Sequence, residues 1–142
     1  MIALLLTLLL VATANAAGDP ARGAEVFRQN CSDCHSREPG ETRTGPTLFS
    51  VVGRPAGSIV EYPYSVAMRH SGLVWTPDHL MLYLRAPRKY LPGVKMSFPG
   101  LRDKKDREDV VAFLGTLHTA PRAGGNGAAP QSSKSAAIRG SQ

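Results

Sequence analysis

The feature that most constrains this chain is the spacing of its two cysteines, Cys31 and Cys34, which His35 follows directly. A C-x-x-C-H run can bond a haem through two thioethers and offer an imidazole to its iron. On one helical turn the two cysteines would hold an edge of the porphyrin, with the histidine beneath the metal. Because the sequence contains no other cysteine, the run predicts a fold organised by a covalent haem rather than by disulfides.

Two other uses of a cysteine pair fit this sequence less well. A redox dithiol normally accompanies a βαβ pattern, which the sequence does not show. A structural zinc needs four nitrogen or sulfur ligands, and the remaining histidines, His70, His79 and His118, show no finger-like pairing. Neither use requires a histidine directly after the second cysteine.

The beginning of the chain predicts export. Residues 1–17 are apolar, uncharged and rich in leucine, and the stretch from Ala14 to Ala16 has the small-x-small pattern of a cleavage site. We therefore expect residues 1–16 to be a cleaved signal peptide. An uncleaved anchor is the alternative, although the apolar run is shorter than the roughly 20 residues that span a bilayer.

The rest of the chain divides into one small domain, residues 17–120, and a tail, residues 121–142. The tail is rich in Gly, Ala, Ser and Pro, a composition that predicts disorder. Half of the formal net charge of +6 comes from this tail, which contains three basic residues and no acids. The domain itself is only modestly basic, so the sequence favours no nucleic-acid partner.

Helix signals in the domain predict an all-α fold of three to five short helices. Asp19, Thr76 and Asp103 are suitable N-caps, and a proline follows the first two. Long loops rich in Gly and Pro connect these segments, and such loops are uncommon unless something organises them. We expect a haem to do so. The first expected helix starts at about residue 20, and the others span about 64–69, 76–86 and 104–117.

A six-coordinate haem needs a second axial ligand, and Met96 is the favoured candidate. Met68 and Met81 lie in or near expected helices, where a methionine normally fills the core. The three free histidines are most simply surface residues. Met96 instead lies in residues 91–100, a loop with Pro and Gly on both sides that can fix a thioether without a regular element.

Ordered motifs extend this pattern over about residues 18–117. With them, the chain resembles class I c-type cytochromes, the branch that contains mitochondrial cytochrome c and bacterial cytochromes c2 and c550. The resemblance implies the small cytochrome c fold, with loops wrapped around one haem c attached through Cys31 and Cys34. The motifs are Gly23 and Phe27 before the haem run, then residues 44–48, Gly53 and Arg54, Tyr62 and Tyr64, Gly72 and Trp75, residues 80–84, 87–100 and 107–114.

The resemblance also assigns roles to individual residues. His35 is the expected proximal iron ligand and Met96 the distal one. Gly23 and Phe113 are expected where the terminal helices cross. The expected supporting residues are Pro46, whose carbonyl accepts the Nδ1 proton of His35, Tyr83, whose hydroxyl bonds the ligand sulfur, and Arg54, Tyr64 and Trp75, which surround the haem propionates.

Two positions depart from the family pattern. Met68 stands where the family often has Asn, and Val94 stands where it often has Thr. Both polar groups belong to hydrogen-bond networks near the propionates and the methionine. The resemblance therefore does not predict the redox potential of this chain or how readily its methionine ligand is exchanged.

The expected function is one-electron transfer by a soluble, monomeric periplasmic carrier of a respiratory or photosynthetic chain, not an enzyme. A terminal oxidase, a bc1-type complex, a reaction centre or a periplasmic dehydrogenase would dock at the haem edge, near Arg88, Lys89 and Lys95. Two alternatives stay open: a membrane-tethered electron-transfer subunit, and a haem enzyme or gas sensor with a displaceable sixth ligand.

Overall fold

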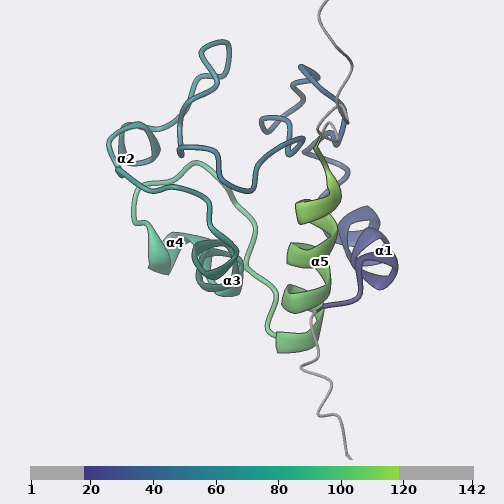
Figure 1. Ribbon diagram of the computed structural model, residues 1–142. Coiled ribbons are helices and arrows are strands. Elements are labelled where there is room, and N and C mark those ends of the chain that lie inside the picture. Colours follow the sequence, from purple (N-terminus) through teal and green to yellow (C-terminus); the bar gives the residue numbers. More distant parts are fainter. Residues whose placement is uncertain (1–17, 119–142) are drawn as a thin grey trace, which may run out of the picture.

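The computed structural model describes residues 18–118 and confirms a small all-α fold (Figure 1). The expected signal peptide and the expected tail beyond residue 120 lie outside the described residues. Within residues 18–118, no helix is both long and apolar enough to cross a membrane, and the only β-type pairing is an isolated bridge. The helices are α1 (Pro20–Asn30), α2 (Val66–Arg69), α3 (Pro77–Arg85), α4 (Pro87–Tyr90) and α5 (Lys104–Thr116).

The three longer helices begin where their caps were expected. The side chains of Asp19, Thr76 and Asp103 accept hydrogen bonds from first-turn backbone N–H groups at 2.9, 3.2 and 3.0 Å. A proline occupies the first turn of both α1 and α3, where a missing N–H costs nothing. Local side-chain chemistry therefore sets these boundaries.

Helices α1 and α5 lie side by side and form the main helix contact of the fold (Figure 1). A Cβ on Gly23 would stand 1.9 Å from the carbonyl oxygen of Asp109, so only glycine permits this approach. Beside it, the rings of Phe27 and Phe113 pack with their centroids 5.4 Å apart. The crossing expected at Gly23 and Phe113 is therefore confirmed.

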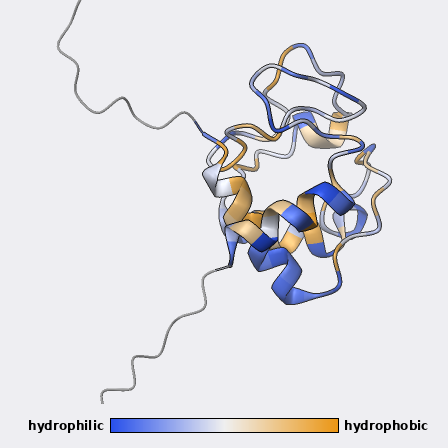
Figure 2. Cartoon of the chain, turned by 90° about the vertical axis from the view of Figure 1, so that its right-hand side faces the viewer, coloured by the Kyte–Doolittle hydropathy of each residue, from blue (hydrophilic) through white to orange (hydrophobic). Residues whose placement is uncertain are grey.

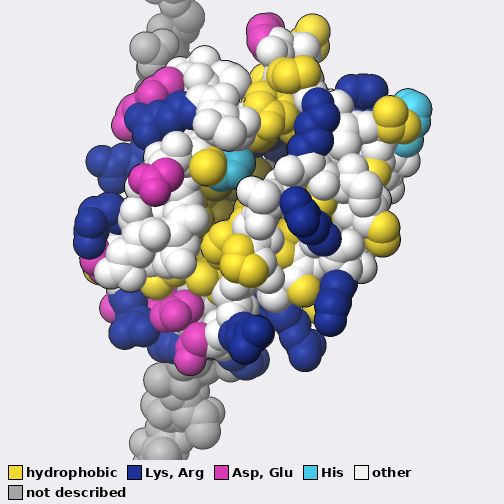
Figure 3. All heavy atoms as spheres, turned by 180° about the vertical axis from the view of Figure 1, so that it is seen from behind, with side chains coloured by type: hydrophobic (Ala, Val, Ile, Leu, Met, Phe, Trp, Pro, Cys, Tyr) yellow, Lys and Arg dark blue, Asp and Glu magenta, His cyan; other side chains and the backbone are white. Residues whose placement is uncertain are grey.

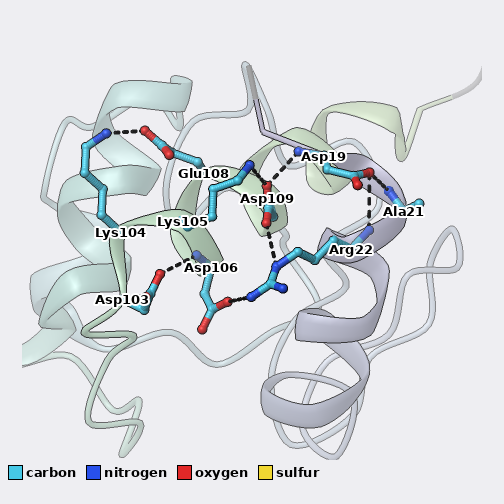
Figure 4. A network of polar contacts seen from close by, with 9 residues as sticks. All are labelled: Asp19, Ala21, Arg22, Asp103, Lys104, Lys105, Asp106, Glu108 and Asp109. Atoms are coloured by element: carbon cyan, nitrogen blue, oxygen red, sulfur yellow. Dashed lines mark hydrogen bonds and ion pairs between the residues drawn. The ribbon is translucent and has the colours of Figure 1, made fainter. Parts of the chain in front are cut away.

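A buried carboxylate in the middle of α5 binds the beginning of α1 (Figure 4). The Asp109 side chain is fully buried and accepts from the Asp19 backbone N–H at 2.7 Å and from Lys105 Nζ at 2.6 Å. Arg22 Nε lies 2.9 Å from its second oxygen, and Arg22 also pairs with Asp106 at 2.8 Å. The hydrogen bond from Lys105 holds the pKa of Asp109 below its usual value.

A short helix that was not among the expected elements follows α3. Pro87 ends α3, as expected, but it also opens the one-turn helix α4 because proline suits a first helical position. The chain then continues without regular structure through residues 91–103, which we call the Met96 strap. The short helix expected at 64–69 spans only Val66–Arg69, capped by the Ser65 hydroxyl.

Candidate haem site

A cavity of about 560 Å³ opens between the loops and the inner faces of α3 and α5. Its volume lies within the roughly 300–1,000 Å³ that is typical of cofactor pockets. Figure 2 shows apolar stretches alternating with polar ones along the helices, and Figure 3 shows a hollow with apolar side chains inside it. The apolar wall includes Leu48, Val51, Leu80, Leu84, Val94, Val110 and Leu114.

The cysteine pair lies at this cavity on a single turn that follows α1. The His35 N–H donates to the Cys31 carbonyl at 2.8 Å, which closes one helical turn through the C-x-x-C-H run. Cys31 is half-buried, Cys34 is exposed, and the two are not joined in a disulfide. Burial, followed by the charge of Cys34, raises the pKa of Cys31 to about 11. A reactive dithiol instead needs a lowered thiol pKa, so this environment does not favour a redox dithiol.

The His35 ring is fixed in one orientation beside the cavity. Its Nδ1 lies 2.7 Å from the Pro46 carbonyl oxygen, and because a carbonyl can only accept, Nδ1 carries the proton and Nε2 keeps its lone pair for a metal. Burial lowers the pKa of His35 despite the Pro46 bond, which favours the neutral ring. A Cβ on Gly45 would lie 2.4 Å from ring atom Cε1, so the ring needs glycine there.

Met96 reaches the same cavity from the strap. The Tyr83 hydroxyl on α3 donates to Met96 Sδ at 3.5 Å, which matches the contact that the resemblance implies. Burial, followed by the charge of Tyr62, raises the pKa of Tyr83 to about 12. The phenol therefore stays protonated at neutral pH and remains a donor.

Met68 also lines this cavity, which agrees with the family position near the propionates and the methionine that the resemblance gives it. It is buried on α2, and no periodicity in so short a helix could show which way it faces. Met81, on α3, packs against the core and is not among the cavity residues. Two methionines therefore compete for the ligand role, and Met96 is the one whose sulfur receives a hydrogen bond.

The residues expected around the propionates line one part of the cavity together. Arg54 donates to the carbonyls of Thr47 at 2.7 Å and Phe49 at 2.9 Å, and it forms no ion pair within residues 18–118. Tyr64 and Trp75 are buried on the same wall. A fixed cation without a carboxylate partner suits an anionic group. Their role toward propionates stays a prediction.

Comparison with known proteins identifies the family. The sequence profile of the family described as cytochrome c matches residues 20–118, most of the 142-residue chain. The chain belongs to the cytochrome c family. Members of this family carry one covalently attached haem c and transfer electrons with it. The cavity fits that group: two thiols and a neutral imidazole lie on one wall, and a thioether reaches it from the strap.

Several relatives cover the same domain. A cytochrome c of Theileria annulata is 46% identical over 98 residues, which are 68% of this chain and 84% of that protein. A cytochrome c2 of Rhodopila globiformis is 45% identical over 100 residues, or 70% and 94% of the two chains. The solved structure of cytochrome cH from Methylobacterium extorquens matches with a TM-score of 0.66 and 42% identity, covering 70% of this chain and 99% of that one.

Proposed function

We propose that this protein is a soluble periplasmic one-electron carrier whose haem c is bonded to Cys31 and Cys34 and ligated by His35 and Met96. The observation that carries the proposal is one cavity lined by the C-x-x-C-H turn and by a methionine whose sulfur is already hydrogen-bonded. When bound, the haem supplies an iron that alternates between ferric and ferrous states.

The chain's own residues would set the potential of that iron. Pro46 holds the His35 ring, and Tyr83 holds the Met96 sulfur, so neither ligand has to move between the two states. The apolar wall keeps water away, and His/Met ligation raises the potential relative to other ligand sets. We therefore expect a clearly positive midpoint potential, and a negative midpoint in a potentiometric titration would contradict Met96 ligation.

A basic face supports docking to an acidic partner. Residues 63–102 contain one acid, Asp78. Their cations form no ion pair within the described chain, whereas six cations elsewhere do. One half of Figure 3 shows dark blue side chains without magenta neighbours, and the other half mixes both colours. The cations of this stretch, which we call the basic face, are Arg69, Arg85, Arg88, Lys89, Lys95 and Arg102.

Such a face would steer association, because unbalanced charge attracts an oppositely charged surface over a distance. The proposed partners are redox complexes: a terminal oxidase, a bc1-type complex, a reaction centre or a periplasmic dehydrogenase. Electron-transfer rates measured with the physiological partner should fall as ionic strength rises. A flat salt profile would contradict steering, although it would leave the haem ligands unaffected.

The proposed location depends on export of the chain. Bacterial relatives such as the cytochrome c2 support a periplasmic protein, together with the expected signal peptide. Mass spectrometry of the intact protein purified from its own cells tests attachment and export together. We expect the mass of a chain that begins at Ala17 plus one haem. A chain without haem would contradict the site, and a haem-bearing chain that still begins at Met1 would favour a tethered subunit.

A further inference from the structure

The Met96 strap is held mainly by side chains rather than by its backbone. Backbone hydrogen bonds fix Leu91 to Pro87 and Leu101 to Leu84, at the two ends of the strap. Between these ends, residues 92–100 make no backbone–backbone hydrogen bond within the described chain. A segment with so few backbone hydrogen bonds opens more easily than a helix, so the side chains that grip it decide how firmly Met96 is held.

Met96 itself is held through both its side chain and its backbone. Tyr83 donates to its sulfur at 3.5 Å from inside the cavity. From the outside, Arg88 Nε on α4 donates to its backbone carbonyl at 3.0 Å. A cationic donor makes a stronger hydrogen bond than a neutral one, and α4 fixes the position of Arg88. The carbonyl and the thioether of the same residue are thus tied to two different helices.

A second cation ties the strap to the opposite wall of the cavity. Lys95 Nζ donates to the Pro63 carbonyl at 2.6 Å. Tyr62 and Tyr64, the neighbours of Pro63, line the same cavity as Met96. The Lys95 contact therefore connects two cavity walls that are far apart in the sequence.

Two other cations of the basic face, Arg85 and Lys89, make no such contact. Within residues 18–118, Arg85 and Lys89 show neither a side-chain hydrogen bond nor an ion pair. Lys89 is adjacent to Arg88, lies on the same helical turn and is also exposed. The chain thus provides two neighbouring charges that differ in whether they hold the strap.

We propose that Arg88 and Lys95 are positioning residues that clamp the Met96 strap, whereas Arg85 and Lys89 only steer the partner. This division rests on the proposed role of Met96 as an iron ligand. Arg88 uses Nε for the Met96 carbonyl, and its two Nη groups remain available for a partner carboxylate. An acidic partner can therefore bind Arg88 without taking its bond from Met96, so docking and a closed strap are compatible.

The test compares Arg88→Gln with Lys89→Gln in the haem-loaded protein. Imidazole is added to the ferric form at fixed pH, and its binding, which requires Met96 to leave, is followed by absorbance. Loss of one exposed hydrogen bond should raise the imidazole affinity of Arg88→Gln by roughly 2- to 10-fold, while Lys89→Gln should bind imidazole like the wild type. Both variants should slow electron transfer with an acidic partner to a similar extent at low salt, because each loses one charge.

Lys95→Gln provides an independent second test. It should raise imidazole affinity as Arg88→Gln does, and neither variant should change global unfolding by denaturant. Equal imidazole affinities in Arg88→Gln, Lys95→Gln and Lys89→Gln would overturn the clamp. A wild-type protein without a sulfur-to-iron absorption band would instead refute Met96 as the ligand, so the two failures can be distinguished.

Discussion

Replacing Gly45 by alanine tests how tightly the proximal histidine is seated. The backbone of Gly45 lies outside the left-handed region, so alanine can adopt its conformation. Its Cβ, however, would stand 2.4 Å from His35 Cε1, whereas ordinary contact begins at 3.4 Å. The ring would have to retreat by about 1 Å, away from Gly45 and from the adjacent Pro46.

That retreat carries the 2.7 Å bond between His35 Nδ1 and the Pro46 carbonyl beyond hydrogen-bonding distance. A buried N–H left without an acceptor costs about 1–3 kcal/mol. We expect Gly45→Ala to lower the free energy of unfolding of the haem-loaded protein by this amount, because the buried His35 N–H would lose its acceptor. Guanidinium titrations followed by circular dichroism measure the difference.

Gly115→Ala is the matched control. Gly115 lies in α5, and a Cβ there would meet nothing within 4 Å. Alanine should leave stability unchanged or raise it by up to about 1 kcal/mol, since glycine is a poor helix former. If Gly45→Ala unfolds at the same guanidinium concentration as the wild type, the close seating of His35 against Gly45 is refuted.

Three further predictions concern the helix crossing, acid stability and the potential. Gly23→Ala should destabilise the protein although helix propensity alone favours it, because its Cβ meets a backbone oxygen at 1.9 Å; guanidinium titrations that show a gain would contradict the crossing. The pKa of Glu25 is lowered from 4.5 to about 2, chiefly by its hydrogen bond from the arginine one turn on. The stabilisation from ionised Glu25 is therefore present above pH 4.5 and is lost as pH falls toward 2. Glu25→Gln should show a shallower decline of the unfolding free energy over this pH range. An unchanged slope would refute the role of the Glu25 carboxylate. Tyr83→Phe removes the hydrogen-bond donor to the Met96 sulfur. Without that hydrogen bond the sulfur is a stronger ligand for ferric iron. A potentiometric titration should therefore give a lower midpoint potential, and a higher one would contradict this.

The sequence alone predicts the helix starts well because their causes are local. Asp19, Thr76 and Asp103 cap the helices at the residues where the cap chemistry places them. The all-α cytochrome c fold and its haem also follow from the ordered motifs, and the family match confirms both. The roles of single site residues in holding the haem stay predictions.

Contacts between distant segments for which the family motifs assign no partner could not be predicted. Nothing in the local sequence shows that Arg88 reaches the Met96 carbonyl or that Lys95 reaches Pro63. Met68 lines the cavity from α2, and a four-residue helix has no periodicity that shows which way it faces. Such contacts depend on the tertiary fold and not on propensity.

Ligation of the iron by Met96 is tested most directly by the near-infrared sulfur-to-iron absorption of the ferric protein. It is recorded near neutral pH for the wild type, for Met96→Ala and for Met68→Leu, since both methionines line the cavity. Ligation by Met96 predicts a band in the wild type and in Met68→Leu that is absent from Met96→Ala. A band that survives in Met96→Ala and disappears in Met68→Leu would contradict it.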